Sequence, residues 1–340
     1  MKGYIRKERR TPMKAIVIIS GKEGGTLEMR DVPEPKPGPG EILLRVKATA
    51  LNRADLYQRQ GLHPTRTAPG SSLIIAGLEA AGEVAALGEG VAGFKVGDRV
   101  MALCQGSYAE LAVFDHRLAV PIPERLSWEE AATIPVSYNT EHNALVTNAR
   151  LKPGESVLIN AASSGVGVAA VQIARLLGAK PIIGTGGSPE KLQALAKLGM
   201  EVGINYRAEN FTDAALAVTK GAGVNVIIDH VGAPFLNDHL RCMALEGRLI
   251  SVGRLAGRVG ELDLDLLALR RLHLIGVTFR TRTLEERIAV TRACATDLVP
   301  AFAAGRLKPV INRVYPLHQT LDAQAYMASN AQLGKIVLTV

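Results

Sequence analysis

The stretch Ser156-Val-Leu-Ile-Asn-Ala-Ala-Ser-Ser-Gly-Val-Gly-Val-Ala-Ala170 decides the fold of this chain of 340 residues. Its first residues are rich in branched apolar side chains and predict a strand over Ser156–Ala161. The residues after the glycines predict a helix over Val168–Leu177. A strand, a glycine loop and a helix in this order are typical of the start of a strand–helix–strand unit.

The alternation of strands and helices continues beyond this unit. Further helices are expected at Pro189–Leu198 and Asn237–Leu245. The other expected strands are Lys180–Gly184, Val202–Asn205, Val224–Asp229, Arg248–Val252 and Leu272–Val277. Six strands with helices between them predict an α/β fold with a doubly wound parallel sheet.

The glycine loop has the spacing of a dinucleotide-binding loop, with glycines at 165 and 167 and an alanine at 170. Gly165 permits a tight turn, and Gly167 lets the backbone approach a pyrophosphate. The helix that follows offers free N–H groups to the anion. The predicted cofactor-binding residues of the loop are Ser163, Ser164, Gly165, Val166 and Gly167. The alternative is a tight turn without a ligand.

The next strand bears on which dinucleotide would bind. An NAD site usually has Asp or Glu about 20 residues beyond the first glycine, where this chain has Gly184. No carboxylate is therefore expected there to repel a 2′-phosphate. Ser188, Lys191 and Tyr206 supply polar or positive groups nearby, so the sequence favours NADPH over NADH. The alternative is that Ser188 only caps a helix and Lys191 is only solvated.

Residues 13–138 follow a different pattern. Short β segments such as Ala15–Ile19 and Glu41–Lys47 are separated by turns rich in Pro and Gly. This spacing predicts a small, barrel-like β domain. Ser127 and Glu130 have the spacing of a capping box, so a helix is expected to begin there.

The net charge of +8 suggests a nucleic-acid partner until its distribution is considered. Residues 1–12 hold five basic residues and one acidic residue, and so carry half of the excess. We expect a flexible basic arm there. It is a frayed terminus, an extension ahead of Met13 or a tail for an acidic partner. It lacks the apolar segment of a signal peptide.

No apolar run approaches the roughly 18–20 residues that span a bilayer. The chain has three scattered cysteines, too few for a disulfide framework and without a CxxC pair. We therefore expect a cytoplasmic protein with neither a membrane nor a nucleic acid as its partner.

Several motifs resemble the medium-chain dehydrogenase/reductase superfamily, in particular its zinc-independent quinone oxidoreductases. They are the glycine loop, Asn52-Arg-Ala-Asp-Leu-Tyr-Gln-Arg-Gln-Gly61, Gly77-Leu-Glu-Ala-Ala-Gly82, Val96-Gly-Asp-Arg-Val100 and Leu333-Gly-Lys-Ile-Val-Leu338. The resemblance implies a GroES-like β-barrel catalytic domain at 13–138, completed by 280–340. It also implies a Rossmann NADPH-binding domain at 139–279.

The motifs depart from the zinc-dependent members of that superfamily. Those enzymes place a Cys in the segment that here begins with Asn52, and a His where this chain has Leu78. A leucine side chain cannot ligate a metal ion. No metal is therefore expected in the site.

The resemblance also implies three catalytic residues. Asn52 would hold the substrate or the nicotinamide, and Tyr57 would orient or protonate a carbonyl oxygen. His63 stands where the branch often has a second Tyr, and it would serve as an acid near neutral pH. The alternatives are a packed aromatic with a satisfied hydroxyl for Tyr57 and a surface loop residue for His63.

Further cofactor-binding residues follow from the resemblance and from positions at strand ends. Thr140 matches a threonine near the nicotinamide. The others are Gly232, Gly253, Phe279, Arg280 and Gln332. Around Thr140, four polar residues replace a mostly apolar sequence: Tyr138, Asn139, Glu141 and His142. They either line a more polar pocket or bond one another where the domains meet.

The resemblance therefore implies an NADPH-dependent reductase of quinones that works as a homodimer or homotetramer. One alternative is a reductase of enones or enoyl thioesters, which also accept hydride at a conjugated system. Another is a non-catalytic NADPH-binding protein, as in the lens zeta-crystallins.

Overall fold

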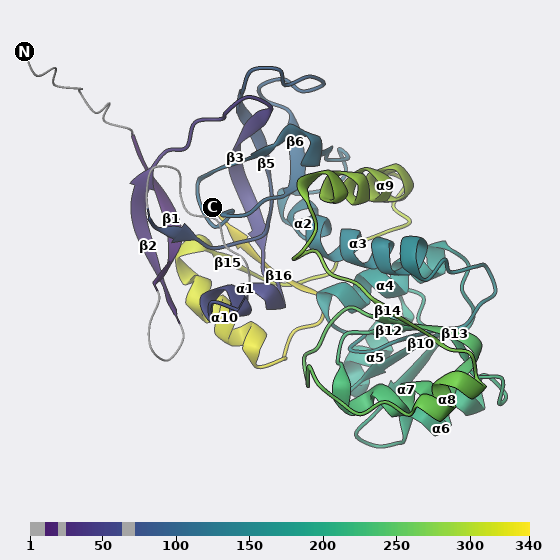
Figure 1. Ribbon diagram of the computed structural model, residues 1–340. Helices are drawn as coiled ribbons and strands as arrows, with labels where there is room; N and C mark the ends of the chain where they lie inside the picture. The colour runs from purple at the N-terminus through teal and green to yellow at the C-terminus, as the bar shows by residue number, and fades with distance from the viewer. Residues whose placement is uncertain (1–10, 20–24, 63–71) are drawn as a thin grey trace, which may run out of the picture.

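The computed structural model describes residues 11–19, 25–62 and 72–340. It has two lobes built on β-sheets, with α2 (Trp128–Ala132), α3 (Ile134–His142) and α9 (Leu284–Ala303) near their junction (Figure 1). A π-helical turn, Asn143–Asn148, continues α3.

The first lobe contains the short strands that the sequence predicts between residues 13 and 138. A three-stranded sheet has the order β2-β1-β4, with β1 at Pro12–Ile19, β2 at Thr26–Pro33 and β4 at Ile74–Ile75. In a seven-stranded sheet, β15-β16-β3-β5-β6-β8 form the path and β7 pairs with β3. Its strands are β3 (Glu41–Ala50), β5 (Glu79–Leu87), β6 (Arg99–Leu103), β7 (Leu111–Asp115), β8 (Ala119–Pro121), β15 (Ile311–Pro316) and β16 (Lys335–Thr339).

The end of the chain completes this lobe. β16 pairs antiparallel with β3, with Leu338 opposite Thr49. Two further helices, α1 (Arg53–Arg59) and α10 (Thr320–Ala328), lie on this side of the molecule (Figure 1). Ser127 and Glu130 form the expected capping box at the start of α2.

The second lobe is the doubly wound sheet that the sequence predicts. Its six strands are all parallel, in the order β11-β10-β9-β12-β13-β14. They are β9 (Val157–Ile159), β10 (Ile182–Gly186), β11 (Val202–Asn205), β12 (Val224–Asp229), β13 (Met243–Ser251) and β14 (His273–Gly276). The helices of this lobe are α4 (Gly165–Leu176), α5 (Pro189–Ala196), α6 (Phe211–Val218), α7 (Leu236–Cys242) and α8 (Leu264–Leu269).

The helix expected over Asn237–Leu245 is three residues too long. The structure ends α7 at Cys242 and begins β13 at Met243, which pairs with Val224 of β12. Met243 is fully buried in this extended conformation. Burial beside β12 therefore outweighs the local helical pattern.

Packing is continuous between the lobes. One cluster of buried side chains includes Ala48 and Met101 from the first lobe and Val157 and Ala170 from the second. Tyr138 of α3 lies in it, with its ring centroid 4.8 Å from that of Phe302. The expected boundary between the two domains lies at residue 139, in the middle of α3. Since the helix is continuous there, the boundary stays a prediction.

Candidate active site

A cavity of about 940 Å³ lies between the two lobes. Tyr57, Leu103 and Phe114 line it from the first lobe, whereas Gly253 and Val277 line it from the carboxyl ends of β13 and β14. Open α/β sheets bind ligands at this edge. Five arginines also line the cavity: Arg53, Arg254, Arg258, Arg280 and Arg287.

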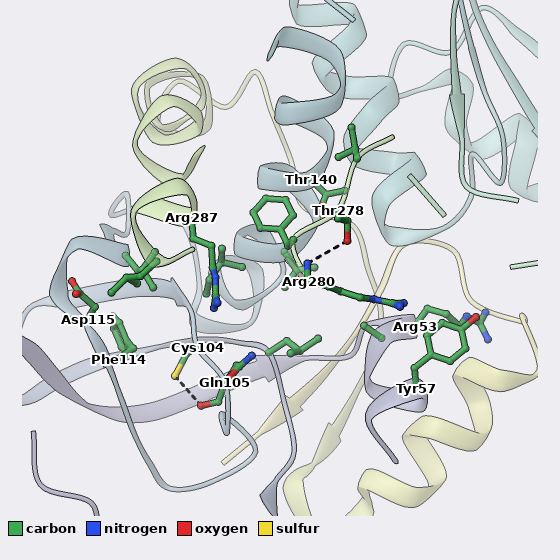
Figure 2. Close-up of a pocket in the computed structure, with 18 of the residues that line it drawn as sticks. Arg53, Tyr57, Cys104, Gln105, Phe114, Asp115, Thr140, Thr278, Arg280 and Arg287 are labelled. Carbon is green, nitrogen blue, oxygen red and sulfur yellow. Dashed lines mark hydrogen bonds between the residues drawn. The ribbon is translucent and has the colours of Figure 1, made fainter. Parts of the chain in front are cut away.

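Tyr57 lies on the second turn of α1, at one end of the cavity. Figure 2 shows its ring beside Arg53, with Arg280 reaching toward both. The side chain is half-buried, and within the described part of the chain no hydrogen bond to its hydroxyl is found. The hydroxyl can therefore accept or donate a hydrogen bond to a molecule in the cavity.

The Asn52 side chain is buried, and both of its polar atoms are bonded. Its Nδ2 donates to Glu79 Oε1 at 2.8 Å, and its Oδ1 accepts from Lys335 Nζ at 2.7 Å. Lys335 also pairs with Glu79 at 2.8 Å, and Val136 N donates to the second oxygen of Glu79 at 2.7 Å. Asn52 thus fixes the start of α1, the helix that carries Tyr57.

Glu79 and Lys335 form a buried ion pair beside the site, at positions that are not among the residues predicted from the sequence. Both are nearly inaccessible to solvent and come from strands far apart in the chain. A buried ion pair of this kind requires close geometry and further hydrogen bonds, which Asn52 and two backbone groups provide. The sequence signal for these two residues was their place in the family motifs: Glu79 lies in Gly77–Gly82, and Lys335 lies in Leu333–Leu338.

Asp55 lies in the first turn of α1 and is also buried. Its Oδ2 accepts from Asn52 N at 2.6 Å and completes a capping box. Burial raises its pKa from 3.8 to about 7, against the opposing effects of the Asn52 N–H, Tyr108 and Lys335. This carboxyl therefore changes charge near neutral pH, inside the same cluster as Glu79.

The glycine loop has the geometry of an anion site. Ser164 caps α4 by accepting from Gly167 N at 3.0 Å, and the other N–H groups of the first turn of α4 have no acceptor within the helix. A Cβ atom on Gly167 would be 2.5 Å from the Ala161 carbonyl oxygen. The loop therefore leaves donors for a pyrophosphate at a helix N-terminus, and residue 167 must be a glycine. These features fit a dinucleotide.

Gly184 is not at a strand tip, which corrects the expectation for that residue. It is the third residue of β10, and a Cβ there would be 2.3 Å from Met200 Sδ. Packing inside the sheet thus accounts for this glycine. The strand continues to Gly186, and Gly187 occupies the tip.

Around Gly187 the structure brings together Tyr206 and a residue that the sequence reasoning missed, Arg207. A Cβ on Gly187 would be 2.8 Å from Tyr206 Oη and 2.9 Å from Arg207 Nε. Both side chains are exposed, so a guanidinium and a hydroxyl are open to an anionic group at this strand tip. The signal in the sequence was the position of Arg207, directly after Tyr206.

Ser188 and Lys191 are partly engaged elsewhere. Ser188 caps α5 and donates to Glu190 Oε2 at 2.7 Å, as its alternative interpretation expects. The Lys191 ammonium donates to the Asn330 carbonyl at 2.8 Å, so it is more than a solvated charge. Burial lowers its pKa.

The remaining predicted cofactor residues divide into two groups. Thr140, Gly253, Phe279 and Arg280 line the cavity. Gly232 does not; it has φ +93 and a Cβ there would be 2.5 Å from the Gly257 carbonyl oxygen, so a tight turn explains it. Gln332 has a buried Oε1 without a described partner. His63 lies outside the described residues.

The four polar residues around Thr140 lie where the lobes meet rather than in the cavity. Tyr138 accepts from Gln172 Nε2 at 3.1 Å. Glu141 pairs with His230 at 2.9 Å, and this pair is buried. His142 pairs with Asp297 at 2.7 Å. Tyr138, Glu141 and His142 therefore bond to other elements at the junction and not to one another.

No group of three His, Cys, Asp or Glu residues able to hold a metal ion occurs in residues 11–19, 25–62 and 72–340. Leu78 lines the cavity. Within the same described ranges, no helix is long and apolar enough to cross a membrane.

Comparisons with known proteins agree with this geometry. Residues 38–124 match the family model for the alcohol dehydrogenase GroES-like domain, and residues 165–293 match that for a zinc-binding dehydrogenase. Quinone oxidoreductase from Rattus norvegicus is 33% identical over 334 residues, which cover 96% of this chain and 97% of the relative. Quinone oxidoreductase from Pseudomonas aeruginosa is 35% identical over 318 residues, 92% of this chain and 95% of the relative.

Solved structures of other proteins have the same fold over nearly the whole chain. A Pseudomonas syringae quinone oxidoreductase superposes with a TM-score of 0.84 at 32% identity, over 96% of this chain and all of the other. A mycobacterial protein complexed with NADPH superposes with a TM-score of 0.86 at 28% identity, again over 96% of this chain and all of the other.

The chain also matches part of a much larger protein. It is 33% identical over 330 residues to a phenolphthiocerol/phthiocerol polyketide synthase from Mycobacterium tuberculosis. The match covers 96% of this chain, but the chain spans only 15% of the length of that synthase polypeptide.

The GroES-like lobe, the Rossmann sheet and the cavity between them define an oxidoreductase of the medium-chain dehydrogenase/reductase superfamily. Within that superfamily, the chain belongs to the quinone oxidoreductase branch. The resemblance seen in the sequence motifs and the expected fold class are both confirmed.

Proposed function

We propose that this protein is an NADPH-dependent, zinc-independent reductase that transfers hydride to a quinone. The observation that carries the proposal is the cavity between the lobes, whose walls combine Tyr57, Leu103 and Phe114 with the strand ends at Gly253 and Val277. A flat, apolar acceptor fits such walls. Quinone oxidoreductases from two organisms, related over nearly the whole chain, support this choice.

The residues of the Rossmann lobe would bind the cofactor. Its bound nicotinamide would supply the hydride. The N–H groups of Gly165 and Val166 would bind the pyrophosphate, together with Ser163 and Ser164. Tyr206, Arg207 and Lys191 would bind the 2′-phosphate that distinguishes NADPH from NADH.

Tyr57 would orient the acceptor and donate a proton to its developing oxyanion. The hydroxyl has no described partner that would compete with the acceptor. Asn52 would act indirectly, since its amide is bonded to Glu79 and Lys335. His63 remains a proposed acid from the sequence alone.

Zinc independence rests on the residues at the metal-ligand positions of the zinc enzymes. Asn52 and Leu78 replace a Cys and a His there, and the Asn52 amide is occupied by an internal ion pair. The developing negative charge would therefore be stabilised by hydrogen bonds rather than by a Lewis acid.

A reductase of enones or enoyl thioesters is the second candidate. The match to part of a polyketide synthase is the observation that favours this candidate. Like the reduction of a quinone, the reduction of an enone or enoyl thioester delivers hydride to a conjugated acceptor. The third candidate, a non-catalytic NADPH-binding protein, is an outcome of the test below.

We also propose a homodimer, formed at the free edge of the Rossmann sheet. β14 has no neighbour on its outer side among the described strands, and Leu274, Leu269 and Val259 are exposed apolar residues near it in the chain. Sedimentation velocity is expected to give twice the mass of the chain; a monomer at micromolar concentration would contradict the dimer.

The three free, buried cysteines suit a reducing cytoplasm, which is the proposed location of the protein.

The test is consumption of NADPH with a panel of ortho- and para-quinones, enones and crotonyl thioesters. Turnover is expected with quinones, and preferred turnover of enones or thioesters would favour the second candidate. Tight NADPH binding without turnover of any acceptor would overturn both enzyme functions.

A further inference from the structure

We propose that Arg287 binds a carboxylate on the acceptor, so that the preferred substrates are acidic. This inference rests on the proposed function and names the class of substrate within it. Arg287 lies on the first turn of α9 and lines the part of the cavity away from Tyr57 (Figure 2).

The guanidinium of Arg287 is aimed into the cavity. Its Nε donates to the Arg282 carbonyl at 3.2 Å, which fixes the direction of the side chain. Its Nη1 and Nη2 have no hydrogen bond or ion pair to any described residue. The two terminal nitrogens of a half-buried cation, with their four N–H donors, are thus left for a ligand, in the fork arrangement that suits a carboxylate.

Four carboxylates near Arg287 in the fold are already engaged. Glu41, which lines the same cavity, accepts from Gly38 N at 2.9 Å. Asp115 accepts from Arg117 Nε at 2.9 Å and from Nη2 at 2.8 Å. Glu285 accepts from Arg117 Nη1 at 2.8 Å. Glu286 accepts from Thr283 N at 2.7 Å in the cap of α9. The missing counter-ion of Arg287 therefore has no candidate on these residues.

The apolar surroundings of Arg287 would strengthen an ion pair between its guanidinium and a bound carboxylate. Leu103, Phe114, Leu118 and Leu284 line the same cavity and present apolar surface. An ion pair that is shielded from water is stronger than one on the open surface. The other arginines of the cavity add positive potential, which attracts an anion from solution.

The acceptor that fits these groups has a conjugated ring and one carboxylate. The ring would lie along the apolar wall, with its reducible oxygen toward Tyr57 and the carboxylate on Arg287. Figure 2 places Arg287 and Tyr57 on opposite sides of Arg280, so the two contacts select different ends of one molecule.

The experiment compares a naphthoquinone carboxylate with its methyl ester, using NADPH and three proteins: wild type, Arg287→Met and Arg292→Met. Arg292 is exposed on the same helix and does not line the cavity, so its substitution removes the same charge from α9. The wild type is expected to favour the acid over the ester by about tenfold or more in kcat/KM, mainly through KM. Arg287→Met is expected to lose this preference, and Arg292→Met to keep it.

Binding provides a readout that does not need turnover. Calorimetric titration with naphthalene-2-carboxylate, which cannot be reduced under these conditions, should give a dissociation constant about tenfold weaker for Arg287→Met than for Arg292→Met. Equal affinity of the two variants, or no preference of the wild type for the acid, would overturn the inference. Absence of turnover with every quinone would overturn the proposed function, while the titration would still decide the role of Arg287.

Discussion

The side chain of Lys335 lies directly over Gly165. A Cβ atom on Gly165 would be 2.5 Å from Lys335 Cδ and 3.1 Å from Cγ. At the end of the same side chain, the Lys335 ammonium donates to Leu51 O, Asn52 Oδ1 and Glu79 Oε1. The nucleotide loop of one lobe is thereby packed against the residues that fix α1, the helix carrying Tyr57, in the other.

Gly165→Ala tests this contact. The added methyl group must displace a lysine side chain whose ammonium is held by three hydrogen bonds. We expect NADPH to bind roughly tenfold more weakly, measured by calorimetric titration. Gly276→Ala is the control, because nothing lies within 4 Å of a Cβ there. Equal NADPH affinity of the two variants would contradict the contact.

Lys335→Met tests the buried ion pair. The substitution leaves the Glu79 carboxylate buried without its cation, and we expect the free energy of unfolding in urea to fall by roughly 3–5 kcal/mol. The double variant Lys335→Met, Glu79→Gln removes both charges and should recover part of that loss. If the double variant loses the sum of the two single losses, the residues do not act as a pair.

Asp55→Asn tests the titration of the buried carboxyl. The folded pKa of about 7 lies above the ordinary value of 3.8, so the folded state retains a proton that the unfolded state releases. The stability from this group is complete below about pH 4 and is lost as pH rises to about 7. Urea unfolding at about pH 5 and pH 8 should therefore show a smaller loss of stability for Asp55→Asn. An unchanged difference would show that another group is responsible.

Arg207→Ala tests the phosphate site at the tip of β10. Removing the guanidinium should weaken NADPH binding by roughly tenfold and leave NADH binding nearly unchanged, since only NADPH carries the 2′-phosphate. Arg241→Ala, an exposed arginine on α7 paired with Asp238, is the matched control. Equal weakening toward both nucleotides would place the 2′-phosphate elsewhere.

Tyr57→Phe tests the hydroxyl in the cavity. We expect kcat with a quinone to fall by roughly 10- to 100-fold, because the variant loses a proton donor but keeps the ring. The NADPH dissociation constant should stay within about twofold of the wild-type value. Tyr326→Phe removes a hydroxyl that bonds Asn312 on the surface and should retain the wild-type kcat. A wild-type kcat for Tyr57→Phe would exclude the hydroxyl from the reaction.

The fold was largely predictable because its signals are local. A glycine loop between a branched strand and a helix defines the Rossmann sheet, and all six of its strands occur where their apolar runs predict. The exception, the end of α7, depends on Met243 packing beside β12, a contact distant in sequence from that helix. Tertiary packing of this kind leaves no local pattern.

The site was less predictable because its residues act through partners far apart in the chain. Asn52 was identified as a group that touches a ligand, but its amide is bonded to Glu79 and Lys335. Gly184 was assigned to a strand tip that lies at Gly187. Arg207 follows the predicted residue Tyr206, but only the fold shows that it reaches the strand tip at Gly187. Arg287 is a single arginine in a basic chain, and only the fold shows that it faces the cavity.

The most direct test of the central claim is the rate of NADPH oxidation by the metal-free protein with a para-quinone, compared with the rate for NADH. Protein is dialysed against a chelator, and its zinc content is measured before the assay. We predict full activity at a zinc content near zero and a kcat/KM for NADPH at least about tenfold above that for NADH. Activity that requires added zinc, or that is equal with NADH, would contradict the account.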